Sequence, residues 1–182
     1  MHKYKQEYNY NISAEKIFNI VKDVKKYPEF LPWCDAVRIL ESNENFFYAN
    51  MLINFKNITE KYTSKVTYLA PENNTRLLAE RAFVKGFEGD LKHRTGVYED
   101  VGLCQESTGY ITSEAINGPF KTLYNKWEFY PIDEANSKVL FEIEFEFKSK
   151  ILNKLIGSLF ETAVRTMTKA FEERAIQYKN NL

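Results

Sequence analysis

The hydrophobic period changes near the end of this sequence, and that change limits the possible fold more than any other feature. From Phe141 to Phe147, apolar residues alternate with glutamates, which is the period of a strand with one buried face. From Ile151 to Tyr178 the apolar residues recur at helical spacing and predict one long C-terminal helix. The helix and the sheet must therefore bury their apolar faces against each other.

Earlier stretches show the same alternation, and only one short helix interrupts them. Ser13 is placed to cap that helix, which carries Ile17, Phe18 and Val21 on one face. Without crossover helices these strands cannot form a parallel sheet. We therefore expect an α+β fold in which a curved antiparallel sheet wraps around the C-terminal helix. The predicted strands are 3–12, 36–42, 46–55, 59–68, 123–129 and 141–147.

Two segments break this rhythm. Pro28 and Pro32 each bias the residue before them away from helix, so residues 27–34 should form a rigid turn rich in aromatic residues. Residues 73–107 are rich in glycine and are interpreted as an insertion in the middle of the sheet, with a short helix from Thr75 to Val84. The chain of 182 residues suits a single domain that contains this insertion.

Charge and composition exclude several classes of protein. The 25 basic residues balance the 25 acidic ones, which disfavours a DNA-binding protein. The longest stretch without a charge, Asn45 to Phe55, is too short to span a bilayer, and the N-terminus has no targeting pattern. Cys34 and Cys104 have no spacing that suggests a metal site or a disulfide framework. We expect a cytoplasmic protein.

Catalytic or metal-binding groups are scarce. His2 and His93 are the two histidines, and neither is placed as the base of a nucleophilic triad. The row Glu142, Glu144 and Glu146 alternates with apolar residues and is interpreted as a solvated strand face. No nucleotide-binding or hydrolase motif is present. We therefore expect neither an enzyme nor a metalloprotein.

The string YPEFLPWC at 27–34 resembles a known family, and further strings support it in the same order. These are YTSKV at 62–66, GPF at 118–120 before WEF at 127–129, and FEFKS at 145–149. The chain resembles the coenzyme Q-binding, START-like family of polyketide-cyclase and lipid-transport relatives, whose bacterial members include a ribosome association toxin. The resemblance covers nearly the whole chain except the insertion at 73–107.

This resemblance implies a helix-grip fold of the START-like or Bet v 1-like type, with a hydrophobic cavity between sheet and helix. It implies non-enzymatic binding of ubiquinone, as a carrier or chaperone that supports respiratory electron transport or quinone biosynthesis, with no cofactor required. It leaves open a second function, inhibition of ribosomal subunit association. A polyketide cyclase or aromatase is a further alternative, but it needs an acid/base pair that the predicted wall lacks.

We expect the cavity wall to be formed by apolar and aromatic side chains from residues 27–33, the inward strand faces and the C-terminal helix. By analogy, the turn at 27–33 would lie at the mouth and make transient contact with the inner face of a membrane. The insertion is either a lid or a surface loop. The predicted wall consists of Tyr27, Phe30, Leu31, Trp33, Met51, Ile53, Phe55, Tyr62, Val66, Phe120, Trp127, Phe145, Leu152, Ile156, Leu159 and Phe160.

Overall fold

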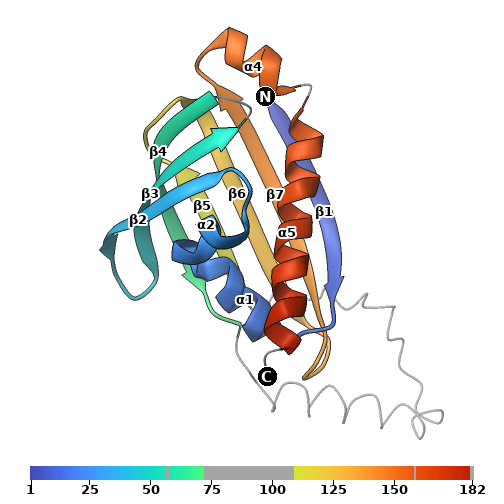
Figure 1. The fold of residues 1–182 in the computed structure, drawn as a ribbon. Helices are drawn as coiled ribbons and strands as arrows, with labels where there is room; N and C mark the ends of the chain where they lie inside the picture. Colours follow the sequence, from blue (N-terminus) through green and yellow to red (C-terminus); the bar gives the residue numbers. More distant parts are fainter. Residues whose placement is uncertain (56–57, 72–108, 158, 181–182) are drawn as a thin grey trace, which may run out of the picture.

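The structure is a computed structural model that describes residues 1–55, 58–71, 109–157 and 159–180. A curved antiparallel sheet faces helices on its concave side (Figure 1). The elements are β1 (His2–Tyr10), α1 (Ala14–Lys22), the 3-10 helix η1 (Val24–Lys26), α2 (Tyr27–Phe30), β2 (Cys34–Ser42), β3 (Phe46–Phe55), β4 (Ile58–Leu69), β5 (Gly109–Ala115), β6 (Phe120–Pro131), β7 (Ser137–Phe147), α4 (Lys150–Gly157) and α5 (Phe160–Asn180).

The described strands form a seven-stranded sheet in the order β1-β7-β6-β5-β4-β3-β2. Neighbouring strands are antiparallel throughout. The N-terminal strand β1 lies at one edge of the sheet, where it pairs with β7. At the other edge, β2 pairs with β3 through a register that shifts twice. The α+β, helix-grip architecture expected from the sequence is confirmed.

The alternation along β7 has the predicted consequence. Phe141 and Phe145 are buried on the concave face. Glu142 and Glu144 point the other way and form ion pairs with Lys5 and Lys3 of β1. The glutamate row is therefore a solvated, charge-paired face, and the described residues contain no cluster able to hold a metal ion.

Helix α1 also follows its prediction. The backbone N–H of Lys16 donates to Ser13 Oγ at 3.4 Å, which caps the helix. Ile17, Phe18 and Val21 are almost fully buried against the sheet. None of the described helices is long and apolar enough to cross a membrane.

The prediction of a non-helical turn at residues 27–34 is wrong at its start. Tyr27 has helical angles (φ −54°, ψ −39°) and opens the single helical turn α2. Proline is well tolerated in a first helical turn, because the N–H groups there have no partner within the helix. The Tyr27 hydroxyl also donates to the Val21 carbonyl at 2.6 Å. Leu31, before Pro32, is extended as expected (ψ 117°).

The prediction of one continuous C-terminal helix is also wrong. Helix α4 ends at Gly157, and α5 begins at Phe160 and crosses the concave face of the sheet (Figure 1). Glycine is a poor helix former and a common helix terminator, which explains the end of α4 at Gly157. The helical spacing of apolar residues continues through this point, so the sequence pattern does not indicate the break. The insertion at 73–107, with the helix predicted from Thr75 to Val84, lies outside the described residues.

The turn between β5 and β6 needs a glycine. Gly118 has a φ of 108°, which side chains rarely adopt. A Cβ atom there would lie 2.5 Å from Tyr62 Cβ and 3.1 Å from the Lys61 carbonyl oxygen, so the turn passes close against the β4 backbone at Tyr62. This close approach seats Phe120 against Tyr62, with ring centroids 5.2 Å apart.

Candidate functional site: an apolar cavity with a polar pair

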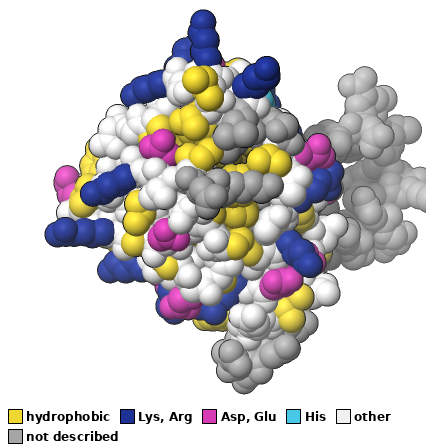
Figure 2. Space-filling view, turned by 45° about the horizontal axis from the view of Figure 1, so that its top comes forward, with side chains coloured by type: hydrophobic (Ala, Val, Ile, Leu, Met, Phe, Trp, Pro, Cys, Tyr) yellow, Lys and Arg dark blue, Asp and Glu magenta, His cyan; other side chains and the backbone are white. Residues whose placement is uncertain are grey.

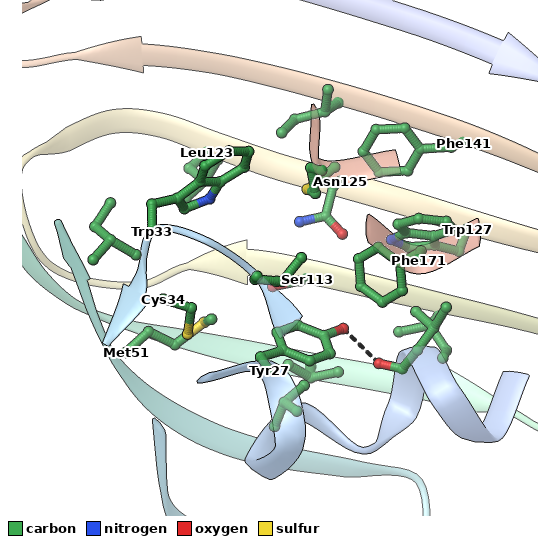
Figure 3. Close-up of a pocket in the computed structure, with 18 of the residues that line it drawn as sticks. Tyr27, Trp33, Cys34, Met51, Ser113, Leu123, Asn125, Trp127, Phe141 and Phe171 are labelled. Atoms are coloured by element: carbon green, nitrogen blue, oxygen red, sulfur yellow. Dashed lines mark hydrogen bonds between the residues drawn. The ribbon is translucent and has the colours of Figure 1, made fainter. Parts of the chain in front are cut away.

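A cavity of about 190 Å³ lies between the concave face of the sheet and helices α1, α2 and α5 (Figure 3). The volume is smaller than the roughly 300–1,000 Å³ typical of small-molecule pockets. The predicted wall residues that do line it are Tyr27, Leu31, Trp33, Met51, Ile53, Tyr62, Val66, Phe120 and Trp127. The cavity is therefore the right size for one ring-sized group.

The other predicted wall residues lie elsewhere. Phe30 packs edge-on against Phe171 with ring centroids 5.2 Å apart, and Phe55 packs edge-on against Trp33. Phe145, Leu152 and Phe160 form a separate cluster near α4, in which the rings of Phe145 and Phe160 are 4.7 Å apart. Leu159 is half-buried in the turn between α4 and α5, and the side chain of Ile156 lies outside the described part.

Two polar residues of the wall were not predicted from the sequence. Ser113 of β5 and Asn125 of β6 are direct partners across the sheet, and both line the cavity. Leu123, Asn125 and Trp127 alternate along β6, so the inward position of Asn125 could have been found from the sequence. Leu123, Phe141, Ile143, Met167 and Phe171 are further lining residues that were not predicted.

This polar pair has free hydrogen-bonding capacity. The Asn125 side chain points into the cavity, beside Trp127 and opposite Ser113 (Figure 3). Within the described part of the chain, neither side chain makes a hydrogen bond. Both side chains are half-buried at the cavity, so a ligand oxygen or a water molecule there can accept or donate the hydrogen bonds that the pair leaves open.

The titratable groups of the wall are neutral at physiological pH. Burial raises the pKa of the Cys34 thiol to about 11. Burial likewise raises the pKa of Tyr27 and of Tyr62 well above the ordinary value for tyrosine. The described wall therefore offers uncharged donors and acceptors around an apolar space.

These raised pKa values predict a loss of stability at alkaline pH. Unfolded protein ionises Cys34 above about pH 9, whereas the folded protein keeps the thiol neutral up to about pH 11. The stabilising contribution is complete below pH 9 and disappears as the pH rises towards 11, at about 2–3 kcal/mol for this thiol. Urea unfolding at a series of pH values measures it. The Cys34→Ala variant should lose less stability over this interval, and an equal loss in both proteins would contradict the assignment.

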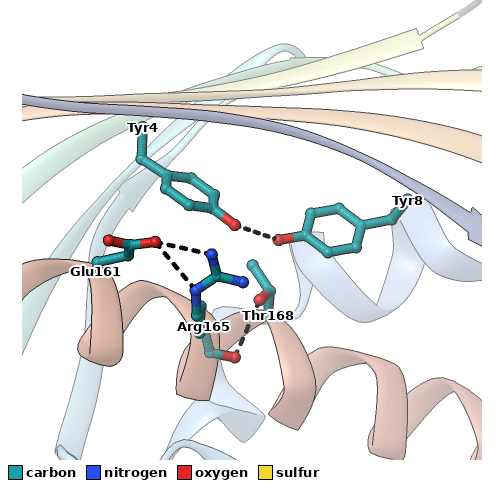
Figure 4. A network of polar contacts seen from close by, with 5 residues as sticks. All are labelled: Tyr4, Tyr8, Glu161, Arg165 and Thr168. Atoms are coloured by element: carbon teal, nitrogen blue, oxygen red, sulfur yellow. Dashed lines mark hydrogen bonds and ion pairs between the residues drawn. The ribbon is translucent and has the colours of Figure 1, made fainter.

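A second polar cluster joins β1 to α5 outside the cavity (Figure 4). The hydroxyl groups of Tyr4 and Tyr8 lie 3.1 Å apart, and burial raises the pKa of Tyr8 to about 12. On the facing helix, Arg165 donates to Glu161 at 2.7 Å, and Thr168 Oγ1 donates to the Arg165 carbonyl. A hydrogen bond between the side chains of Tyr8 and Thr168 links the two groups, so the cluster connects the edge strand to the helix.

Residues 10–172 match the family described as polyketide cyclase / dehydrase and lipid transport. The chain belongs to this family. Among relatives, it is 34% identical to the ribosome association toxin RatA of Rickettsia prowazekii over 88% of this chain and 87% of the relative. It is 32% identical to the RatA of Vibrio cholerae over 92% of this chain and 90% of the relative.

A more distant relative carries a different name. The chain is 24% identical to the mitochondrial coenzyme Q-binding protein COQ10 homolog B of Xenopus laevis, over 90% of this chain and 53% of the relative. The family expected from the sequence strings is thus confirmed, with both of the named kinds of relative.

Solved structures show the same fold. The Zhui aromatase/cyclase of Streptomyces sp. R1128 aligns with a TM-score of 0.68 at 12% identity, covering 97% of this chain and 94% of that one. The 18 kDa protein CC1736 of Caulobacter crescentus aligns with a TM-score of 0.63 at 23% identity, covering 99% of each chain. At these identities the likeness establishes the helix-grip fold alone.

Proposed function

We propose that this protein binds a ribosomal subunit and hinders the association of subunits, as a non-catalytic, toxin-like regulator in the cytoplasm. One observation carries the proposal: relatives at 32–34% identity, aligned over about nine-tenths of the chain, are ribosome association toxins. The uncharged cavity wall is consistent with binding rather than acid/base catalysis. Ubiquinone binding, which the sequence resemblance favoured as the main function, is therefore the second candidate.

Sucrose-gradient profiles of ribosomes test this proposal. Purified protein added to dissociated subunits should increase the free-subunit peaks at the expense of whole ribosomes, in proportion to its concentration. The protein itself should sediment with one of the subunits. A folded protein of similar size and neutral charge is the control. An unchanged profile with the protein in large molar excess over ribosomes would overturn the proposal.

A second candidate function is binding of a prenyl quinone, and a specific observation favours it. The cavity combines an apolar wall with the unbonded pair Ser113 and Asn125, which suits a flat ring that carries oxygen atoms. The relation to a coenzyme Q-binding protein supports the same class of ligand. With about 190 Å³, the cavity holds a head group, and a long prenyl tail must extend beyond it.

Lipid analysis tests this second function. Protein purified from a quinone-producing host should release a prenyl quinone on extraction, identified by mass spectrometry. The Asn125→Leu variant, which keeps the size of the side chain but removes its hydrogen bonds, should retain about tenfold less. Asn54 is exposed on β3 and lies outside the cavity wall, so the Asn54→Leu variant is the matched control. If no quinone co-purifies with the protein and none is taken up from vesicles, this candidate function is overturned.

A further inference from the structure

The end of the molecule that carries α4 exposes an apolar side chain among lysines. Ile151 is 80% exposed, the largest fraction for any large hydrophobic residue in the described part. Lys148, Lys150 and Lys154 surround it in sequence and are all exposed. Residues 148–160 contain these three lysines and no carboxylate. We call the surface formed by Ile151 and the three lysines the α4 tip.

An apolar base supports the α4 tip. Leu152 packs against the buried rings of Phe145 and Phe147, together with Phe55 and Ile58 from the ends of β3 and β4. Figure 2 shows this end of the molecule turned forward, with hydrophobic side chains near the centre of the face and Lys and Arg side chains around its margin, among some acidic ones. The surface is therefore amphipathic, with its charges outside its apolar centre.

Hydrogen bonds hold the α4 tip in place. The Leu152 N–H donates to Ser149 Oγ at 3.3 Å and caps the helix. The Phe147 N–H donates to Asn153 Oδ1, and Lys148 Nζ donates to the Gly118 carbonyl at 2.9 Å. Within the described residues, Lys150 and Lys154 form no ion pair. A fixed helix thus presents two unneutralised charges beside an exposed aliphatic side chain.

We propose that the α4 tip docks on an anionic lipid membrane, with Ile151 entering the interface and the lysines facing the head groups. Lysines near an anionic surface and an aliphatic side chain in the interface both contribute favourably. An RNA surface would attract the lysines but would offer Ile151 no apolar phase. Phe120 and Leu123 belong to both the cavity wall and the apolar base, so docking would turn that end of the cavity towards lipid.

Vesicle co-sedimentation tests this proposal, using phosphatidylcholine vesicles with and without phosphatidylglycerol. The full chain should bind the anionic vesicles. The double variant Lys150→Glu/Lys154→Glu should bind them at least about 25-fold more weakly, at about fivefold for each lysine. Ile151→Asn should bind about tenfold more weakly, and because Ile151 is exposed the fold should be unaffected.

Matched charge reversals control for nonspecific attraction. Lys16 and Lys25 are exposed on α1 and η1, and the variant Lys16→Glu/Lys25→Glu should bind vesicles like the parent. Equal weakening by this control, or no binding of the parent to anionic vesicles, would overturn the proposal. In another outcome, the parent fails to bind vesicles while the tip variants no longer bind ribosomal subunits. That result would assign the α4 tip to RNA binding, and it too would overturn the membrane proposal. The vesicle and gradient assays are separate, so this proposal and the proposed ribosome function fail independently.

Discussion

Replacing Phe171 with alanine should lower the free energy of unfolding by about 3–5 kcal/mol. The Phe171 ring is 1% exposed and contacts three others, with centroids 5.4 Å from Tyr27, 5.2 Å from Phe30 and 5.0 Å from Trp127. It therefore joins α5 to α2 and to the floor of the cavity. Removing it leaves a void that the curved sheet cannot close, and aromatic contacts are lost in addition. Urea unfolding followed by circular dichroism measures the effect.

The same helix provides the control for this substitution. Ile176 is 54% exposed, so Ile176→Ala should change the free energy of unfolding by less than about 0.5 kcal/mol. If Phe171→Ala were as mild as Ile176→Ala, the packing of α5 on α2 described here would be wrong.

Replacing Ser113 with phenylalanine should weaken binding of a short-chain quinone by at least about a hundredfold, since the added ring takes space that the ligand needs. The cavity has about 190 Å³, and a phenyl group fills much of it. Trp33 and Trp127, the only two tryptophans in the chain, both line the cavity, so quenching of intrinsic fluorescence reports occupancy directly. Near-ultraviolet circular dichroism establishes that the variant keeps its packed core.

A control on the same strand isolates the effect of filling the cavity. Thr112 is the neighbour of Ser113 on the opposite face of β5, so Thr112→Phe adds the same ring outside the cavity and should bind quinone like the parent. Equal quenching in Ser113→Phe and the parent would show that the quinone binds elsewhere. If Ser113→Phe still alters ribosome profiles, ribosome binding does not use the cavity.

Alternation made six of the seven described strands predictable from the sequence, whereas β5 (Gly109–Ala115) was not predicted. Along β7, the inward residues Phe141, Ile143 and Phe145 are each followed by an outward glutamate, and a one-residue error in register would have buried the glutamates. The curvature of the sheet and its closure by a helix followed from the need to cover one apolar face. The breaks in helical structure were less accessible: Gly157 lies within continuous apolar spacing, and Pro28 fits either a turn or the start of a helix.

The cavity wall could be predicted only in part, for a physical reason. Strand parity identifies inward residues such as Met51, Tyr62 and Trp127 but cannot say how far along the strand the open space extends. Phe145 points inward too, yet it lies where the core is already filled by Phe160. Asn125 also lies inward by strand parity, but its polar side chain gives no hydrophobic signal that marks it as part of the wall.

The two register shifts in β2 have a consequence for solubility. An edge strand with regular unpaired N–H and C=O groups can template the addition of a strand from another copy, which leads to aggregation. In β2 the pairing slips between Cys34 and Ala36 and again between Ile39 and Glu41. Such bulges twist an edge away from a flat ladder. The outer side of β2 is thus a poor template, which favours a protein that remains dispersed at high concentration.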